Sequence, residues 1–460
     1  MFKRVGRVAI CLVLGLGLAA CQAVAVRDPD SAPVLTQKLQ SRAPSAPGID
    51  APELARLGRY PVGTTLEQFV LPSRVTLTTD GVSAGKLETV VRTLPARVWY
   101  PAHAAPGAQP TSYSHTFALP GGKSIQLSTE GIAFEDARPV DGGRFPLVVV
   151  SHGYGGWSES MSYLTENLAS KGYVVVAIDH LDMPAGARTN SQLDFANVLM
   201  DRARDQREVI SALVAKSATL KIGYPSIIDP SKIGLIGYSM GGYGALSTAG
   251  AAYDPESPML KLMPSQGRTA LLQDGGPDVS AEIKAIVTIA PWGGQPSVRM
   301  WTAEALKQIR SPILIIDGDE DDIVDFKGGV RWMFDELSVD RQLLVFQGAR
   351  HNVGNIPAPS NLEEPFSALE SFAEPIWRTD RINAINQHFV TAFLDLRLKG
   401  DASRAAYLKL PTSQSNQGVW KGPPDLPPGG MTAADGQPEY WRGFQRRWAL
   451  GLELHHVAVE

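Results

Sequence analysis

The sequence has little cysteine, no strong excess of charge of either sign and no hydrophobic run long enough to span a membrane. Its two cysteines, Cys11 and Cys21, could form at most one disulfide. The 43 basic and 47 acidic residues give a formal charge of −4, so no general basic field favours nucleic acid. The apolar run at 8–20 is too short for a membrane-spanning helix. With 44% hydrophobic residues, the composition is that of a globular protein.

The first twenty residues have the pattern of a bacterial signal peptide. Three basic residues precede the apolar run, which ends in the letters LAAC at 18–21. This ending resembles the lipobox, in which the cysteine is acylated after cleavage. We therefore expect 1–20 to be a lipoprotein signal peptide and Cys21 to carry a lipid that holds the protein to the membrane. The alternative is an ordinary secretory signal peptide with a chance cysteine.

Cleavage before Cys21 would remove Cys11 with the signal peptide. If the remaining thiol carries lipid, no disulfide can form, and the core alone must hold the fold. Residue 22 is Gln rather than Asp. By resemblance to the sorting rules of Gram-negative bacteria, this favours lipid anchoring in the outer membrane of the bacterial cell envelope, with the protein on its periplasmic or extracellular face.

Both ends of the mature chain differ in composition from its middle. Residues 21–58 are rich in Ala, Pro, Ser and Asp without apolar periodicity, which predicts a flexible tether. Residues 401–460 form a C-terminal extension with a Pro/Gly-rich stretch at 422–430 and an aromatic, basic stretch at 440–448. The aromatic and basic residues do not separate onto two helix faces, so we expect this stretch to pack on the main domain rather than lie on a membrane.

The middle of the chain predicts an α/β fold with a doubly wound, mostly parallel sheet. Continuous apolar runs typical of strands buried on both faces alternate with amphipathic helical patterns. We expect one domain over 59–400, with loop insertions near 251–282 and 352–376. The predicted strands lie at 74–79, 94–100, 145–150, 173–178, 232–238, 283–289, 312–316 and 342–346, with a hairpin near 124–128. The predicted helices lie at 158–171, 201–216, 240–251, 330–337 and around 382–396.

Two segments match G-x-S-x-G, the pattern of a nucleophile elbow. Ser239 follows the buried apolar run of the strand at 232–238 and opens a helix rich in small residues. An elbow requires this setting, because its glycines allow the tight turn that exposes the serine hydroxyl at the helix start. Ser83 follows a polar, Thr-rich segment, and we expect it in a hairpin turn. The sequence therefore predicts Ser239 as the nucleophile.

A serine nucleophile requires a base, and the base is oriented by an acid. His351 directly follows the last predicted strand, where the base of such a fold lies. His388 falls inside a predicted helix, where we expect it packed or solvated, and His455 and His456 lie near the C-terminus. The acid should follow the strand at 312–316, where acidic residues crowd at 317, 319–322 and 325. A solvated acidic loop and a calcium site are the alternatives for this run.

The negatively charged intermediate of acyl transfer needs backbone N–H donors. One donor should be the amide of Met240, directly after the nucleophile. The other should come from the glycine-rich loop at 151–156, where we expect Tyr154 to supply it and His152 to brace the loop. The alternative, a phosphate cradle, lacks the Lys-Ser/Thr ending of a P-loop.

Several motifs together resemble the dienelactone-hydrolase-like branch of the α/β-hydrolase superfamily, which includes platelet-activating-factor acetylhydrolases and bacterial cutinase-like polyester hydrolases. They stand at 152–154, 168–173, 237–242, 290–292, 321–324 and 351. The resemblance implies that Asp321 is the acid, since 318–324 fits the family pattern G-x-x-D-x-x-V. It also implies that Tyr154 and Trp292 border the acyl site, and we expect Trp157 on the opposite wall. The cysteine nucleophile of dienelactone hydrolases proper is not found here.

The sequence thus predicts a serine esterase that needs neither cofactor nor metal. It would cleave a small-molecule or lipid ester through an acyl-enzyme intermediate, as a member of the carboxylesterase and lipase-like enzymes. A serine peptidase or amidase on the same fold is one alternative. A non-catalytic binding protein of the cell envelope is another, which an intact Ser239, Asp321 and His351 disfavour.

Overall fold

The computed structural model describes residues 43–119, 123–182, 192–215, 227–274, 276–419, 440–445 and 448–459. The chain divides into two units, Met1–Arg42 and Ala43–Glu460. The predicted signal peptide, Cys21 and residues 22–42 of the predicted tether lie outside the described residues, as does the stretch at 422–430. The second unit carries all of the elements discussed below.

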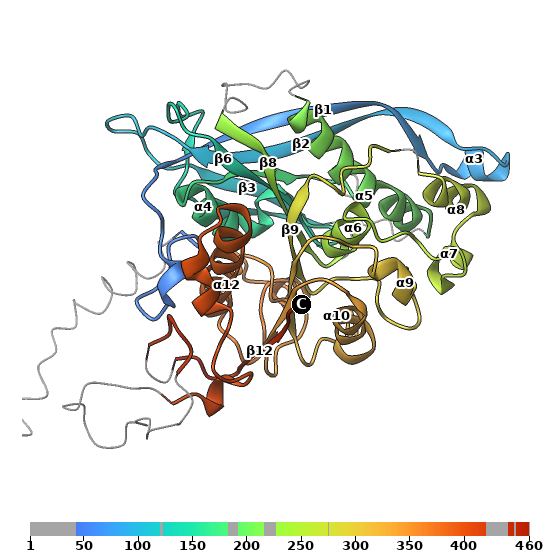
Figure 1. Cartoon of the computed structure of the whole chain (residues 1–460). Helices are drawn as coiled ribbons and strands as arrows, with labels where there is room; N and C mark the ends of the chain where they lie inside the picture. Colours follow the sequence, from blue (N-terminus) through green and yellow to red (C-terminus); the bar gives the residue numbers. More distant parts are fainter. Residues whose placement is uncertain are drawn as a thin grey trace, which may run out of the picture. The chain divides into compact units, whose positions relative to one another are not determined.

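A large twisted sheet forms the centre of this unit (Figure 1). Its strands are ordered β12-β11-β10-β9-β8-β6-β7-β2-β1-β5. The run from β7 to β11 is parallel, and the central residues of its strands are mostly apolar and buried, as in strands covered on both faces. In chain order the bounds are β1 (Val62–Thr76), β2 (Glu88–Pro101), β5 (Phe134–Glu135), β6 (Phe145–Ser151), β7 (Val174–Ile178), β8 (Ile228–Tyr238), β9 (Ile283–Ile289), β10 (Ile313–Gly318), β11 (Arg341–Phe346) and β12 (Leu452–Val457).

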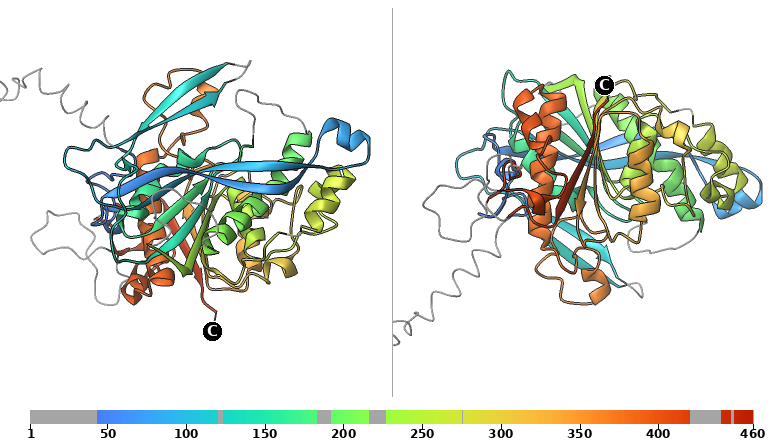
Figure 2. Two further views of the ribbon diagram at one scale, coloured as in Figure 1. Left: turned by 90° about the horizontal axis from the view of Figure 1, so that it is seen from above. Right: turned by 60° about the horizontal axis from the view of Figure 1, so that its bottom comes forward.

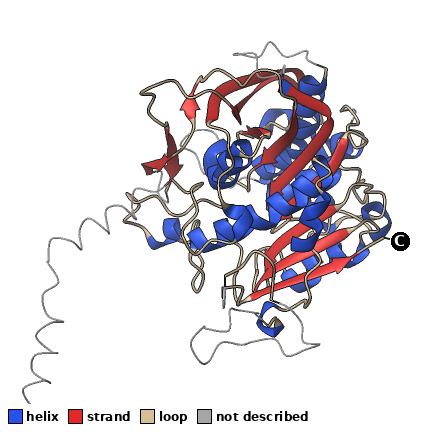
Figure 3. Cartoon of the chain, turned by 60° about the vertical axis from the view of Figure 1, so that its left-hand side comes forward, coloured by secondary structure: helices blue, strands red, loops and turns tan. Residues whose placement is uncertain are grey.

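Helices cover both faces of the sheet (Figures 2 and 3). On one face α4 (Ser162–Ser170) packs with α12 (Thr379–Leu398), and on the other α5 (Gln192–Val214) packs with α6 (Met240–Thr248). The shorter elements are η1 (Glu53–Ala55), α3 (Thr79–Ser83), η3 (Ser158–Met161), α7 (Pro258–Leu262), α8 (Ser265–Leu272), α9 (Ala303–Leu306), α10 (Trp332–Glu336), α11 (Phe366–Leu369), η6 (Ala402–Tyr407) and η7 (Ser415–Gln417). Within the part of the chain that the structure describes, no helix is long and apolar enough to cross a membrane.

The predicted α/β architecture is confirmed, and the parallel strands lie within a few residues of their predicted bounds. The largest difference in the first strands concerns β1, which begins at Val62 rather than at 74 and pairs antiparallel with β2 as a long hairpin. The predicted helix at 330–337 is preceded by a π-helical turn, η5 (Phe326–Arg331), and α10 begins only after it. A second hairpin, β3 (Ser112–Ala118) with β4 (Ser124–Glu130), confirms the one expected near 124–128.

The prediction of a flexible tether reaching residue 58 is wrong for residues 43–58. Ser45 is fully buried, and its hydroxyl donates a 2.6 Å hydrogen bond to the buried carboxylate of Glu166. Leu54 donates its backbone N–H to His388 Nδ1 at 3.1 Å. Small and polar residues lack an apolar period, yet they pack closely here because specific partners satisfy their polar groups.

The C-terminal extension is part of the main domain, which corrects the boundary predicted at 400. The strand β12 pairs antiparallel with β11 and forms one edge of the sheet. Trp441 is 1% exposed and packs against Phe389 and Phe444. His388 is buried in the same aromatic cluster, as expected for a packed helix histidine. The described part of the aromatic stretch therefore packs on the domain, as predicted.

The two predicted insertions take different positions. Segment 251–282 carries α7 and α8, and Gln266 Nε2 donates to the carbonyl oxygen of Val82 in α3, at the tip of the β1–β2 hairpin (Figure 1). Segment 352–376 carries α11 and lies beside the β3–β4 hairpin, where Asn361 Nδ2 donates to the carbonyl of Gln126 (Figure 2). Of the described residues in the two insertions, those of the second line the pocket described next and those of the first do not.

Candidate active site

Ser239 lies in a tight turn between β8 and α6. Its φ of 52° and ψ of −113° are unusual for a residue with a side chain, and such strain is typical of a nucleophile elbow. Both flanking positions require glycine, because a side chain at either one would collide with the backbone. A Cβ on Gly241 would lie 2.0 Å from the Ser151 carbonyl oxygen, and one on Gly237 would lie 2.2 Å from the Gly241 carbonyl oxygen. The G-x-S-x-G pattern thus has a steric cause here.

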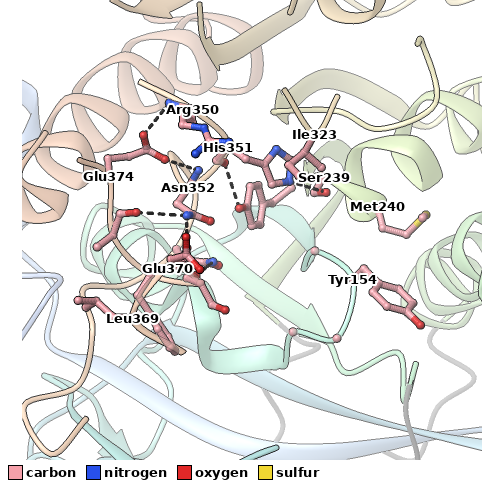
Figure 4. Close-up of a pocket in the computed structure, with 18 of the residues that line it drawn as sticks. Tyr154, Ser239, Met240, Ile323, Arg350, His351, Asn352, Leu369, Glu370 and Glu374 are labelled. Atoms are coloured by element: carbon pink, nitrogen blue, oxygen red, sulfur yellow. Dashed lines mark hydrogen bonds between the residues drawn. The ribbon is translucent and has the colours of Figure 1, made fainter. Parts of the chain in front are cut away.

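His351 lies in the loop that follows β11 and contacts Ser239. Its Nε2 is 3.0 Å from Ser239 Oγ (Figure 4). Its Nδ1 is 2.7 Å from Asp321 Oδ2. The two ring nitrogens therefore connect a hydroxyl with a carboxylate, which is the geometry that activates a serine. The structure brings these three predicted residues together from three loops after β8, β10 and β11.

Asp321 is buried in the loop after β10, and its second oxygen is also satisfied. Oδ1 accepts the backbone N–H groups of Ile323 at 2.8 Å and Val324 at 3.0 Å. Burial raises the pKa of this carboxyl. The hydrogen bond and charge of His351 and the backbone N–H of Val324 lower it by more than burial raises it, so the pKa lies below its usual value. Asp321 is thereby held in its charged form.

The neighbouring acids face other partners. Asp319 accepts the backbone N–H of Gly348 at 2.5 Å, and Asp322 pairs at the surface with Arg350. Asp325, in the left-handed conformation, accepts the N–H of Gly328. Among the described residues, no group of three or more His, Cys, Asp or Glu side chains is arranged to hold a metal ion.

Asp317 is the unexpected acid of this loop. It is completely buried at the end of β10, and neither carboxyl oxygen has a well-aligned donor among the described residues. Burial and the charge of Asp321 raise the pKa of Asp317 well above its usual value. A protonated Asp317 can donate a hydrogen bond to Asp321, which also contributes to the low pKa of that residue. The pKa values of these two neighbouring carboxyl groups are therefore shifted in opposite directions.

Tyr154 and Met240, the predicted oxyanion donors, line the same pocket as Ser239. The glycine-rich loop that carries Tyr154 follows β6. His152 is buried beside it, and His152 Nδ1 lies 2.7 Å from the Gly153 carbonyl oxygen. This arrangement is consistent with a bracing role for His152.

The pocket has a volume of about 990 Å³ and two aromatic sides. On one side Trp292 packs edge to face on Phe195 and Tyr243, and Phe195 also contacts Tyr154. On the other side Trp157 is 6% exposed and lies between the ring of His115, which stacks on it, and those of two pocket-lining residues, Phe117 and Phe372.

Sequence reasoning missed several lining residues of this second wall. Phe117 comes from the β3–β4 hairpin, and Phe366, Leu369 and Phe372 come from segment 352–376. Phe366 is 72% exposed and Leu369 is 39% exposed, so they form an apolar rim at the mouth of the pocket. The position of the segment just after His351 was the available signal, since long loops beside a site often line it.

Ser83, the other G-x-S-x-G serine, lies in a short helix, α3, within the turn of the β1–β2 hairpin. Its hydroxyl donates to the Thr79 carbonyl oxygen at 2.9 Å. The expected hairpin position is correct, although the turn itself is helical.

Comparisons with known proteins find similarity to ester hydrolases. A family model described as PETase, PET hydrolase-like, matches residues 138–261, which include Tyr154 and Ser239 but end before Asp321 and His351. Cutinase 2 of Thermobifida cellulosilytica is 27% identical over 48% of this chain and 65% of its own length. A bis(hydroxyethyl) terephthalate hydrolase of Streptomyces coelicolor is 25% identical over 50% of this chain and 58% of its own length.

A solved ferulic acid esterase from Streptomyces cinnamoneus has a similar fold, with a TM-score of 0.50 and 21% identity, covering 74% of this chain and 91% of that one. The chain therefore has the α/β-hydrolase fold. The match spans about half to two thirds of the length of the curated relatives. This fold and the similarity to cutinases and a terephthalate ester hydrolase agree with the resemblance seen in the sequence motifs.

Proposed function

We propose that this α/β-hydrolase cleaves carboxylic esters through an acyl-enzyme intermediate formed on Ser239. The observation that carries the proposal is the continuous hydrogen-bonded chain from Ser239 Oγ through the ring of His351 to Asp321. Support also comes from the names of the relatives, which are cutinases, a terephthalate ester hydrolase and a ferulic acid esterase.

In the first half-reaction, Ser239 Oγ attacks the ester carbonyl carbon while His351 Nε2 takes the hydroxyl proton. Asp321 holds the ring through Nδ1 and stabilises its charged form. The backbone amides of Tyr154 and Met240 stabilise the negative oxygen of the tetrahedral intermediate. When the intermediate collapses, the ester C–O bond breaks, and His351 returns the proton to the departing alcohol.

In the second half-reaction, water attacks the acyl carbon and gives a proton to His351. Collapse of the second intermediate releases the carboxylic acid, and the proton returns to Ser239 Oγ. The aromatic sides of the pocket suit esters with an aromatic or apolar acyl part, since Trp292 and Phe195 offer ring faces and edges beside the nucleophile.

The test compares Ser239→Ala with Ser83→Ala. A fluorophosphonate probe should label the wild type and Ser83→Ala but not Ser239→Ala, and hydrolysis of p-nitrophenyl butyrate should follow the labelling. Activity on methyl ferulate, bis(hydroxyethyl) terephthalate and a polyester film defines the substrate class. A folded Ser239→Ala protein with undiminished ester hydrolysis would refute the mechanism.

We also propose that the mature protein is attached to the bacterial envelope through a lipid on Cys21, in the outer membrane. The support is the lipobox-like ending at 18–21 and Gln22 after it. Wild type and Cys21→Ser would be produced in a Gram-negative host and fractionated. The wild type should sediment with outer membranes and the variant should be released. Recovery of both in the soluble periplasm would exclude lipid anchoring.

A further inference from the structure

Arg202 is a fully buried arginine on α5 that the steps above do not use. Burial of a guanidinium is unfavourable unless hydrogen bonds and an opposite charge compensate for the lost water. Its partners therefore indicate what this side chain holds in place.

Among the described residues, the hydrogen-bond partners of Arg202 are the glycine-rich loop at 151–156 (the oxyanion loop) and Asp182, which binds that loop. Its Nη1 donates to the His152 carbonyl oxygen at 2.5 Å, and its Nη2 donates to the Gly153 carbonyl oxygen at 3.0 Å. Its Nε donates to Asp182 Oδ1 at 3.1 Å, and Asp182 Oδ2 in turn accepts the backbone N–H of Gly155 at 2.9 Å. The ion pair of Arg202 and Asp182 thus contacts the backbone on both sides of Tyr154.

The Gly153 carbonyl oxygen is held by three donors. Besides Arg202, it accepts the backbone N–H of Gly156 at 3.1 Å and contacts His152 Nδ1 at 2.7 Å. His152 Nε2 accepts the N–H of His180 at 3.1 Å, so the ring proton lies on Nδ1, which donates to Gly153.

This carbonyl belongs to the same peptide group as the N–H of Tyr154. In a planar trans peptide the C=O and N–H bonds point in opposite directions. Donors fixed on the Gly153 oxygen therefore fix the direction of the Tyr154 N–H. A charged donor also polarises the peptide, which strengthens the N–H as a hydrogen-bond donor.

The helix that carries Arg202 is itself fixed by a second Ser–His–Asp arrangement. Ser151 Oγ lies 2.8 Å from His180 Nε2, and His180 Nδ1 lies 3.0 Å from Asp205 Oδ2. All three side chains are at most 1% exposed, so a substrate cannot reach them. Burial lowers the pKa of His180 to about 4, which keeps it neutral. Asp205 also binds Arg74 and Arg92, so this arrangement joins β6, α5 and the β1–β2 hairpin.

We propose that Arg202 is a positioning residue for ester hydrolysis, which orients and polarises the peptide that presents the Tyr154 N–H to the oxyanion. The inference rests on the proposed function, since it assumes acyl transfer at Ser239. It predicts that Arg202 contributes to stabilisation of the transition state and contributes little to substrate affinity.

The test compares Arg202→Lys with Arg204→Lys, a change of the same kind on the same helix. Lysine keeps the charge but cannot make the forked contacts of a guanidinium. Arg204 pairs with Glu208 and Asp274 and does not contact the loop. The measurements are kcat and KM on p-nitrophenyl butyrate, the melting temperature, and the Ki of an aryl trifluoromethyl ketone. This inhibitor adds to the serine and places an oxyanion in the site.

For Arg202→Lys we expect kcat to fall roughly 10- to 100-fold, which is part of the loss that follows removal of one oxyanion donor. KM should stay within about threefold, and the Ki of the ketone should rise by the same factor as kcat falls. A general structural defect would not link these two quantities. Arg204→Lys should leave both within about twofold.

A folded Arg202→Lys protein with kcat and Ki within about twofold of wild type would overturn the proposal. If that variant does not fold, Asp182→Asn takes its place, because it removes the charge that aligns Arg202 and keeps the side-chain shape. A folded Asp182→Asn protein with unchanged kcat and Ki would also overturn it. Retained activity in Ser239→Ala would instead refute the proposed function itself.

Discussion

Five aspartates lie between Asp317, near the end of β10, and Asp325, and each has a different environment because the chain turns sharply between them. Asp321 faces His351, whereas Asp322 faces solvent and Arg350. Asp317 lies on the strand side of the turn, buried against Asp321. At the scale of the single residue, these side chains are chemically identical. The direction in which each carboxylate points decides which of them binds the histidine.

The pairing of Asp321 with His351 predicts its effect on turnover. Asp321→Asn should lower kcat by about 10³- to 10⁴-fold with KM nearly unchanged, because the histidine loses the group that fixes its tautomer and stabilises its charge. Asp319→Asn and Asp322→Asn are the matched controls, and each should cost under about tenfold. Steady-state kinetics on one soluble ester would measure all three. A greater loss in either control would assign the acid to that position.

The raised pKa of Asp317 predicts a stability effect that depends on pH. The folded state keeps its proton to higher pH than the unfolded state, so the folded protein loses stability as pH rises from the unfolded pKa toward the raised folded one. Asp317→Asn removes this loss, and the introduced amide can still donate to Asp321. The melting temperature of the variant should exceed that of wild type by about 1–3 °C at pH 8, and the difference should shrink toward pH 4.

Asp335→Asn serves as the control for this experiment, because Asp335 is 53% exposed on α10. Its melting temperature should differ from wild type by a similar amount at both pH values. A variant of Asp317 that is less stable than wild type at pH 8 would show that the buried carboxyl is needed in its charged form.

At the scale of elements, the strands that are buried on both faces were the most predictable. The strand β9 has its predicted bounds because the mostly apolar residues 283–289 fit a buried strand and show no helical periodicity. The strand β12 was missed because a short edge strand containing His455 and His456 has no comparable apolar run. The β1–β2 hairpin was predicted only in part, since its strands expose many residues.

The candidate site divides in the same way. Ser239 and His351 could be predicted because each follows a recognisable strand, whereas Asp321 required the family pattern. Arg202 and Phe372 could not be predicted, because their roles depend on contacts with segments about fifty and more than two hundred residues away. Contacts between segments so far apart in the sequence can be identified only from the three-dimensional structure.

The loop after β9 should shape the acyl side of the pocket through Trp292. Because its ring packs on Phe195 and lines the pocket, Trp292→Ala should change the preference among p-nitrophenyl esters of different chain length. The effect should be seen in kcat/KM ratios, with a smaller change in melting temperature. Trp157→Ala is the comparison on the opposite wall. A large stability loss with unchanged preference would make Trp292 a core residue.

At the scale of the whole molecule, the segment before β1 and the segment before β12 contact each other, although they lie far apart in the sequence. Gln445 Nε2 donates to the Ala51 carbonyl oxygen at 2.7 Å, and Glu53 donates its N–H to the Gly443 carbonyl oxygen at 2.8 Å. The residues before β1 and those before β12 thus form one layer over α12. Stability of the domain should depend on residues far from the catalytic loops.

Trp441 tests this dependence. It is 1% exposed, and its indole N–H donates to the Thr412 carbonyl oxygen at 3.1 Å. Trp441→Ala should cost about 3–5 kcal/mol in the free energy of unfolding, measured with urea, while kcat of the folded protein stays within about threefold. Trp448→Ala, at a 42% exposed position, should cost under about 1 kcal/mol. Equal losses at both positions would contradict the assignment of Trp441 to the core.

The burial of Ser45 against Glu166 also decides where this protein can be shortened. Glu166 accepts hydrogen bonds from the Ser45 hydroxyl, the Tyr113 hydroxyl and the N–H groups of Ile132 and Ala133. A chain that starts at residue 59, where composition alone would set the cut, loses the first of these donors and the segment that covers them. A chain that starts at residue 43 keeps all four of these donors, so residue 43 rather than residue 59 is where a shortened form of this domain should begin.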